Sequence, residues 1–292
     1  MQLRWRRFSG FLLLLAAVAG FAPAGFAAAA AAGGVVGAPK PWEMGLQPGY
    51  SPVKRDMIAL NDAVLLIITL ITMLVAGLLL WIIVRYNAKR NPVPSQVSHN
   101  TVLELAWTII PILILVGIAI PSFRLVFYEN KTEHPFMTVK VTGHQWYWEY
   151  TYPAEKIDYS SYVVTGKNRK PGQPRLLTAA PALVLPVGKN IRILETSGDV
   201  IHSFFIPSLG VQRYAIPGRL IETWVRIDKP GVFYGECNQI CGTNHSRMPI
   251  EVRGVSMAEF KAWLATAKKK YAMAGVGAGW GGTAQRLAAN GQ

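Results

Sequence analysis

Two long apolar runs in the first half of the chain indicate how it is organised. Residues 63–84 contain no charged side chain, and residues 101–120 contain only one, Glu104. A helix of about 20 apolar residues is long enough to cross the hydrocarbon core of a bilayer. The pattern therefore predicts a transmembrane helical hairpin over residues 63–121, with Pro121 ending the second helix.

The loop between these two runs is short and cationic, because it carries Arg85, Lys89 and Arg90. Such loops remain on the cytoplasmic side of a membrane. We therefore expect a multi-pass protein of a bacterial inner membrane, with both termini on the periplasmic side. Residues 33–62 are then an N-terminal periplasmic segment.

The N-terminus has the pattern of a targeting sequence. Three arginines lie within the first seven residues, and a short apolar stretch and a run of alanines follow them. This order is typical of a secretory signal peptide, which we expect over residues 1–32. An uncleaved membrane anchor is the alternative.

Beyond residue 121 the long apolar runs give way to short β-type segments that are separated by Pro and Gly. Segments of this length and spacing predict an all-β domain over residues 122–255, either a sandwich or a Greek-key barrel. Residues 153–181, rich in Pro and Gly, are expected to form a surface excursion. The predicted strands are 138–142, 144–150, 183–187, 190–195, 201–206, 222–227, 232–236 and 250–253.

The C-terminal end is predicted to hold one helix and a tail. Ser256 and Glu259 have the spacing of a capping box and indicate a helix over residues 256–271. Residues 272–292 contain many glycines and few bulky side chains, which favours a disordered tail.

Composition agrees with a membrane protein. Hydrophobic residues make up 51% of the chain and charged residues 16%, so neither an ordinary soluble protein nor a wholly disordered one fits. The net charge of +14 would suit nucleic acid or an anionic membrane surface. Because the basic residues are scattered among apolar runs, we expect no nucleic-acid partner.

Only two cysteines are present, and both lie in one short segment. This number excludes a disulfide-dense scaffold, a four-thiolate zinc site and most iron–sulfur clusters. Cys237 and Cys241 are followed closely by His245 and Met248, and His202 precedes them at the start of a predicted strand. Sulfur and imidazole ligands together select copper, or zinc where four strong ligands are available.

The number of ligands separates the possible sites. A mononuclear blue-copper site would leave one thiolate unused, and a Cys₂His₂ zinc site would leave Met248 unused. Two bridging thiolates, one imidazole per metal and weak outer ligands use the whole set, which favours a binuclear copper site for electron transfer. A Cys237–Cys241 disulfide remains the alternative.

Several motifs in the same order resemble the subunit II family of haem–copper cytochrome c oxidases, over roughly residues 42–265. They are Glu104-Leu-Ala-Trp107-Thr-Ile-Ile-Pro111, Gly143-His-Gln-Trp146-Tyr-Trp148-Glu-Tyr150, His202-Ser-Phe-Phe-Ile-Pro207-Ser-Leu-Gly210, Ala215-Ile-Pro-Gly-Arg219 and the cysteine segment.

The resemblance implies a two-helix transmembrane hairpin and an all-β cupredoxin-like Greek-key domain with a binuclear copper centre, CuA. It also implies electron uptake from cytochrome c and transfer to haem in subunit I, where oxygen is reduced to water and protons are pumped. Subunits I and III are the expected partners. The implied copper ligands are His202, Cys237, the backbone carbonyl of Gln239, Cys241, His245 and Met248.

One position departs from the family pattern. The family usually has Glu where this chain has Gln239, and that side chain helps to bind an interfacial magnesium ion. Ligation of copper by the carbonyl does not depend on the side chain. A neutral amide is a poorer ligand for a hard dication, so the magnesium site is in doubt.

The resemblance also implies roles for residues outside the copper set. Trp146 would be the surface residue through which electrons enter, and Glu104 would lie at the entrance of a proton pathway. Docking of a basic cytochrome c would use local acids, for which Glu149, Asp158 and Asp199 are the candidates. However, residues 122–292 carry 21 Lys and Arg against 12 Asp and Glu, so overall attraction of a basic partner is not expected.

Three other interpretations compete with an oxidase subunit. A quinol-oxidase subunit would lack the copper ligands. A stand-alone membrane-tethered cupredoxin, acting as electron carrier or copper chaperone, would need neither Glu104 nor Trp146. A non-redox β-domain would hold a disulfide. No Cys-x-x-Cys-His motif is present, so no fused c-type haem is expected. His99, His134 and His144 are interpreted as structural.

Overall fold

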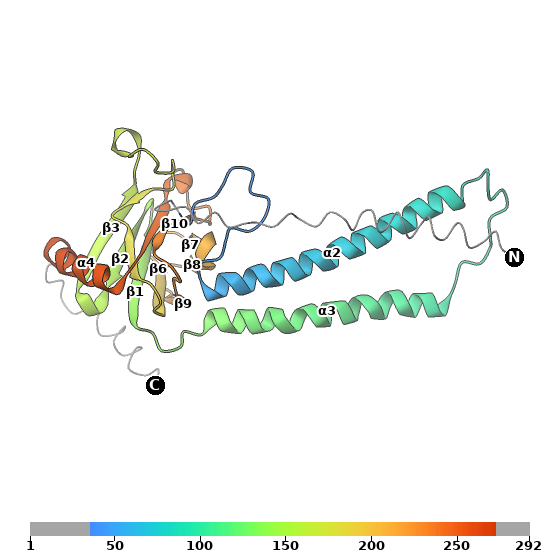
Figure 1. Cartoon of the computed structure of the whole chain (residues 1–292), viewed down its shortest axis with the longest axis horizontal. Helices are drawn as coiled ribbons and strands as arrows, with labels where there is room; N and C mark the ends of the chain where they lie inside the picture. The colour runs from blue at the N-terminus through green and yellow to red at the C-terminus, as the bar shows by residue number, and fades with distance from the viewer. Residues whose placement is uncertain (1–35, 273–292) are drawn as a thin grey trace. The chain divides into compact units, whose positions relative to one another are not determined.

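The computed structural model describes residues 36–272, drawn in colour in Figure 1. The predicted signal peptide and the predicted tail beyond residue 272 lie outside these residues. Two long helices come first, and eleven strands and a last helix follow them (Figure 1).

The two helices of the hairpin are α2 (Pro52–Arg85) and α3 (Thr101–Asn130). Each begins at a side-chain cap: the Ser51 hydroxyl accepts from the Lys54 N–H, and the Asn100 side-chain oxygen Oδ1 accepts from the Leu103 N–H. Both have the length and apolar composition of a membrane span, and the apolar window of each is entirely unburied within the described residues.

Both helices are longer than the sequence pattern predicts. Helix α2 begins at Pro52 rather than near Ala63, and α3 continues through Pro121 to Asn130. The prediction that Pro121 ends the helix was therefore wrong. A proline removes one hydrogen bond but does not forbid further turns. The turns beyond it are held at their end, where the Trp224 indole N–H donates to the Tyr128 carbonyl oxygen over 3.0 Å.

Two sheets form the β-domain that follows. One sheet has the order β4-β3-β2-β1-β6-β9 and the other has the order β5-β11-β10-β7-β8. Strands β1 and β6 pair in parallel, as do β5 and β11, and the other pairs are antiparallel. The strands are β1 (Met137–His144), β2 (Tyr147–Tyr152), β3 (Ile157–Val163), β4 (Ala179–Ala180), β5 (Leu183–Pro186), β6 (Ile191–Ser197), β7 (His202–Ile206), β8 (Val211–Ala215), β9 (Ile221–Val225), β10 (Gly231–Cys237) and β11 (Pro249–Val255).

The core lies between the two sheets and contains many aromatic rings. Trp148 and Tyr150 occupy alternate positions of β2, and both are buried. Each contacts Phe204 of β7 edge to face. Helix α4 (Met257–Lys270) adds Phe260 to this core, and the predicted capping box of Ser256 and Glu259 is formed. The two-sheet cupredoxin-like architecture expected from the sequence is confirmed.

Three strand predictions need correction. The predicted strand 144–150 is interrupted, because β1 ends at His144 and β2 begins only at Tyr147. Strand β8 was not predicted. The segment 153–181 is not wholly a surface excursion, because it contains β3 and β4, and Ile157 and Tyr159 of β3 point into the core. The flanking Pro and Gly residues obscured this alternation.

Candidate metal centre

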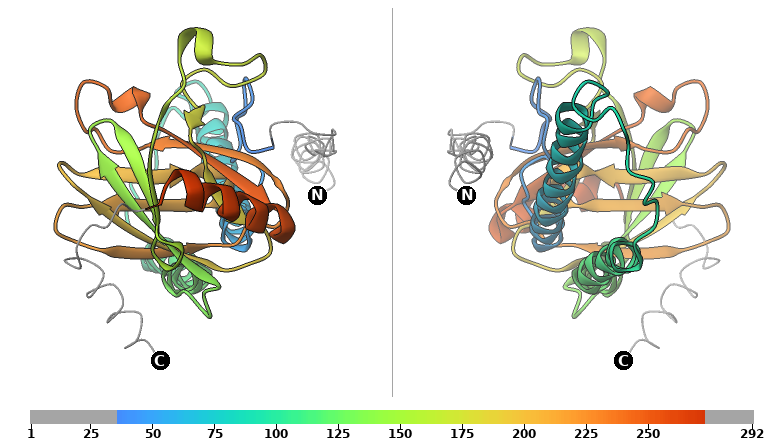
Figure 2. Two further views of the ribbon diagram at one scale, coloured as in Figure 1. Left: turned by 90° about the vertical axis from the view of Figure 1, so that its left-hand side faces the viewer. Right: turned by 90° about the vertical axis from the view of Figure 1, so that its right-hand side faces the viewer.

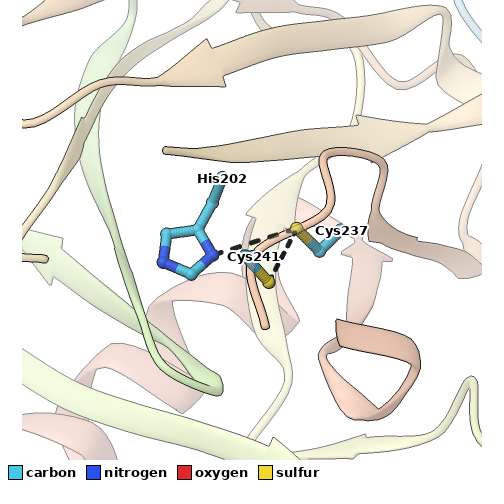
Figure 3. A group of neighbouring side chains, drawn as sticks. All are labelled: His202, Cys237 and Cys241. Atoms are coloured by element: carbon cyan, nitrogen blue, oxygen red, sulfur yellow. Dashed lines mark hydrogen bonds between the residues drawn. The ribbon is translucent and has the colours of Figure 1, made fainter. Parts of the chain in front are cut away.

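Two neighbouring strands bring the sulfur and imidazole residues together. Strand β7 begins at His202, and β10 ends at Cys237. These strands are antiparallel neighbours, with Cys237 opposite Phe204. The start of one strand therefore lies beside the end of the other, and the cysteine loop between β10 and β11 closes over this edge (Figure 3).

The donor atoms form a chain of short contacts. The Sγ atoms of Cys237 and Cys241 are 3.8 Å apart. Cys237 Sγ lies 3.9 Å from His202 Nδ1, and Cys241 Sγ lies 3.6 Å from His245 Nδ1. Each sulfur thus has an imidazole nitrogen within 3.9 Å. Figure 3 shows the first imidazole and both sulfurs pointing toward one another.

The two cysteines are free thiols in this arrangement. Their sulfurs are 3.8 Å apart, whereas a disulfide requires about 2.05 Å. Both residues are buried, with 3% of Cys237 and 5% of Cys241 exposed. The disulfide alternative is therefore not what the structure contains.

The two weak ligands implied by the resemblance also lie at this cluster. The Gln239 carbonyl oxygen is 3.3 Å from Cys237 Sγ. Met248 is buried within the same core cluster as both cysteines, and its carbonyl oxygen accepts from the Cys237 N–H. All six sequence-predicted ligand residues therefore meet at one edge of the domain.

The two thiols differ in acidity. Burial raises the pKa of Cys237, but hydrogen bonds with His202 and with the backbone outweigh burial and lower this pKa to about 7. Burial and the adjacent Cys237 sulfur raise the pKa of Cys241 to about 12. The first proton therefore leaves readily, and the second is retained until a cation compensates the paired negative charge.

Sequence reasoning missed a supporting role for Asp199. Its Oδ1 atom lies 2.8 Å from His202 Nε2, and its Oδ2 atom accepts from the Gln145 backbone N–H over 2.6 Å. Burial opposes ionisation of Asp199, but these hydrogen bonds lower the pKa of its carboxyl below the usual value. A carboxylate on the distal nitrogen of a ligand histidine orients the ring and raises its basicity. The three-residue spacing to His202 was the available signal.

Trp146 lies in the turn between β1 and β2, against the cysteine loop. Its indole N–H donates to the Cys241 carbonyl oxygen over 3.3 Å, and the Gln145 side-chain amide donates to the same oxygen over 2.8 Å. Trp146 is half-buried. Gly242 has a φ of 120°, and a Cβ atom there would lie 3.0 Å from the indole ring, so the close approach requires glycine.

Glu104 lies far along the chain from this cluster, in the first turn of α3. Its carboxylate accepts from the Asn100 backbone N–H over 3.2 Å and lies 2.6 Å from His99 Nδ1. These contacts are those of a helix cap. His99, interpreted as structural from the sequence, is thus a partner of Glu104.

The remaining candidate acids lie on the outer face of the β1–β2–β3 sheet. Glu149 is 3.5 Å from His144 Nε2. Asp158 stands on β3 opposite Thr151, and burial raises the pKa of its carboxyl.

His134 is exposed, and its φ is 45°.

The donor set fits copper. Two thiols, two imidazoles and a thioether are soft or borderline ligands, and the donor cluster of His202, Cys237 and Cys241 contains no carboxylate. The fold and the donor set together define a cupredoxin-like domain with a soft-metal site, joined to a helical hairpin.

Comparison with known families narrows this class. The family model for the transmembrane domain of cytochrome c oxidase subunit II matches residues 39–125, and the family model for its periplasmic domain matches residues 137–255. The chain belongs to the cytochrome c oxidase subunit II family and is a membrane protein.

Two curated relatives agree with this assignment. A probable cytochrome c oxidase subunit 2 of Rickettsia bellii is 46% identical over 79% of this chain and 86% of its own length. Cytochrome c oxidase subunit 2 of Cereibacter sphaeroides is 40% identical over 80% of this chain and 83% of its own length. The crystal structure of the periplasmic domain of subunit II from Bradyrhizobium japonicum is 45% identical, covers 49% of this chain and all of that one, and has a TM-score of 0.46.

Proposed function

We propose that this chain carries the binuclear CuA centre of a cytochrome c oxidase in a bacterial inner membrane. It would accept electrons from cytochrome c on the periplasmic side and pass them to haem in subunit I, where oxygen is reduced to water and protons are pumped. Subunits I and III would be its partners.

The paired arrangement of donors carries this proposal. Each sulfur has one imidazole within 3.9 Å, and the sulfurs are 3.8 Å apart. Cys237, Cys241, His202 and His245 would hold two metals, with Met248 and the Gln239 carbonyl as weak ligands. When bound, copper supplies a one-electron redox couple. The ligand residues stand on strand ends and a loop packed into the domain, so little needs to move when an electron is transferred.

Copper stoichiometry tests the proposal. The purified oxidase should contain two coppers in this chain and show the purple mixed-valence absorption of a thiolate-bridged pair. The variant Cys241→Ser should lose both, whereas Thr243→Ser, in the same loop, should lose neither. One copper, or none, in the wild-type chain with reduced thiols would contradict the proposal.

Trp146 is the proposed point of electron uptake. Its indole N–H donates to the Cys241 carbonyl, so the ring is linked to a ligand residue by one hydrogen bond. Trp146→Phe should slow electron uptake from cytochrome c while the copper absorption is retained. Tyr147→Phe, one residue further along, should leave the rate nearly unchanged. Equal rates in both variants would remove this role from Trp146.

Glu104 is the proposed entrance of a proton pathway into subunit I. Its position in the first turn of α3, at the expected cytoplasmic end, supports this role. Glu104→Ala should lower turnover and proton uptake in the assembled complex, and the control Glu133→Ala should not. Because Glu104 also caps α3, Glu104→Gln serves as a second variant that retains a hydrogen-bond acceptor.

Magnesium is the one family cofactor that we do not assign. Two residues after Cys237 stands Gln239, whose amide is a weaker ligand for Mg²⁺ than a carboxylate. Gln239→Glu should strengthen magnesium binding in the complex without changing the copper absorption. Metal analysis of both forms measures this difference.

A further inference from the structure

We propose that the electron donor of this chain presents an acidic surface around its redox centre, and that it docks on a cationic loop beside Trp146. This inference rests on the proposed function, and it names the chemical character of the partner. It replaces the expectation that acids of this chain attract a basic donor.

The cationic loop is residues 164–178, between β3 and β4. It contains Lys167, Arg169, Lys170 and Arg175 and no acidic residue. All four cationic side chains are exposed, and none forms an ion pair with another residue in the part of the chain that the structure describes. Four uncompensated charges on one loop create a strong local positive potential.

The strand register brings this loop to the electron-uptake end of the sheet. Strand β2 begins at Tyr147, directly after Trp146, and β3 ends at Val163 with Ser161 opposite Trp148. Tyr162 stacks on Tyr147 with ring centroids 4.8 Å apart. The loop leaves β3 two residues later, where the Val164 N–H donates to the Thr178 carbonyl. Figure 2 shows it, in yellow-green at the top, on the same side of the domain as the orange cysteine loop.

The three candidate docking acids offer little free negative charge to a basic partner. Asp199 bonds to His202 and to the Gln145 N–H. Glu149 lies 3.5 Å from His144. Burial raises the pKa of Asp158, and its buried Oδ1 atom has no hydrogen-bond partner among the described residues. Two of the three carboxylates thus lie beside an imidazole of the same chain and the third is partly withdrawn from solvent, so they attract a basic partner less than free surface acids would.

An exposed apolar tip completes the docking surface. Ile240 is 83% exposed at the end of the cysteine loop, and Ile201, next to the ligand His202, is 44% exposed. Arg247, also exposed, adds a cation on the same loop. An apolar centre with a charged rim is the usual composition of a transient interface. The five exposed cations of the rim outnumber its two exposed acids, Asp199 and Glu236, so the complementary partner is acidic.

Electron uptake by the purified oxidase tests the proposal with two forms of one probe. The probe is a mono-haem cytochrome c, either with its native lysines or with those lysines succinylated, which reverses their charge. The bimolecular rate constant for the succinylated form should fall as salt is added, and that for the native form should rise.

Charge-reversal variants locate the effect. The triple variant Lys167→Glu/Arg169→Glu/Lys170→Glu should slow uptake from the succinylated probe about tenfold at low salt. The matched control Lys261→Glu/Lys269→Glu/Lys270→Glu changes the net charge equally. It lies on α4, where Lys268 pairs with Glu155 of the β2–β3 turn, at the opposite end of β2 from Trp146. Its effect should stay within about twofold, because these charges lie further from the docking site.

The outcomes separate this inference from the proposed function. If wild-type oxidase with intact copper absorption takes electrons faster from the native probe, and salt weakens that reaction, the inference is overturned while the function stands. Equal effects of the two triple variants also overturn it. If the chain does not bind two coppers, the proposed function itself is contradicted. The variant Lys167→Gln/Arg169→Gln/Lys170→Gln, which alters charge less, should give an intermediate rate.

Discussion

Two histidine–carboxylate pairs in this chain have similar distances and different surroundings. His202 Nε2 lies 2.8 Å from Asp199, and His99 Nδ1 lies 2.6 Å from Glu104. The side chain of His202 is 0% exposed, whereas that of His99 is 72% exposed. The second ring nitrogen of His202 faces the Cys237 sulfur, and that of His99 faces the Thr101 hydroxyl.

The comparison shows that burial and the second neighbour determine what such a pair does. An exposed pair in water contributes little to stability. At the start of α3, the exposed pair completes a helix cap. In the buried pair, the carboxylate fixes the ring plane and leaves Nδ1 directed at the sulfurs. Only the buried pair can position a metal ligand.

Removal of the histidines should give the largest difference between the pairs. His202→Ala takes away the imidazole whose Nδ1 lies 3.9 Å from the Cys237 sulfur, so the two-copper absorption should be lost. His99→Ala should leave the copper content and absorption unchanged. Metal analysis and absorption spectroscopy of the two oxidase variants measure this difference, and copper retained by His202→Ala would refute the ligand assignment.

Replacement of the carboxylates should give a smaller difference. Asp199→Asn keeps the shape of the side chain but removes the charge that supports His202. Loss of such a hydrogen-bond partner of a ligand histidine lowers metal affinity about 10–100-fold. Competition with a copper chelator should reveal that loss. Glu104→Gln, the matched change in the exposed pair, should not alter copper affinity at all.

Thiol reactivity should show the influence of the buried pair through pH. In the metal-free, reduced protein the pKa of Cys237 is lowered to about 7, so its thiolate is present above that pH and is lost below it. Alkylation should therefore be about tenfold slower at pH 6 than at pH 8. In Asp199→Asn the midpoint should move to higher pH, since His202 then carries less positive charge. An unchanged midpoint would show that Asp199 does not influence the pKa of the Cys237 thiol.

Crowding of the ligand ring should have the smallest effect. A Cβ atom on Gly143 would lie 2.8 Å from the His202 ring, whereas one on Gly45 would meet nothing within 4 Å. Gly143→Ala should cost about 1–3 kcal/mol of folding free energy through overpacking, and it should lower the temperature at which the copper absorption is lost. Gly45→Ala should not change this temperature.

Much of the fold could be predicted from local pattern. The two apolar runs, the capping box at Ser256 and eight strand segments were visible in the sequence, because each depends on neighbouring residues only. Strand β3 was missed because Pro and Gly flank it, and α3 was cut short at Pro121 because its last turns are held by Trp224, which lies 96 residues away along the chain.

The sequence by itself determined the membrane hairpin and the candidate metal ligands between Cys237 and Met248, because apolar length and the spacing of these residues are local properties. Only the tertiary structure decided which groups surround those ligands. Asp199 behind His202, the Gln145 amide on Cys241, and the cationic loop beside Trp146 all depend on strand register. The Gln145–Cys241 contact joins residues 96 positions apart, and no local pattern records a contact of that range.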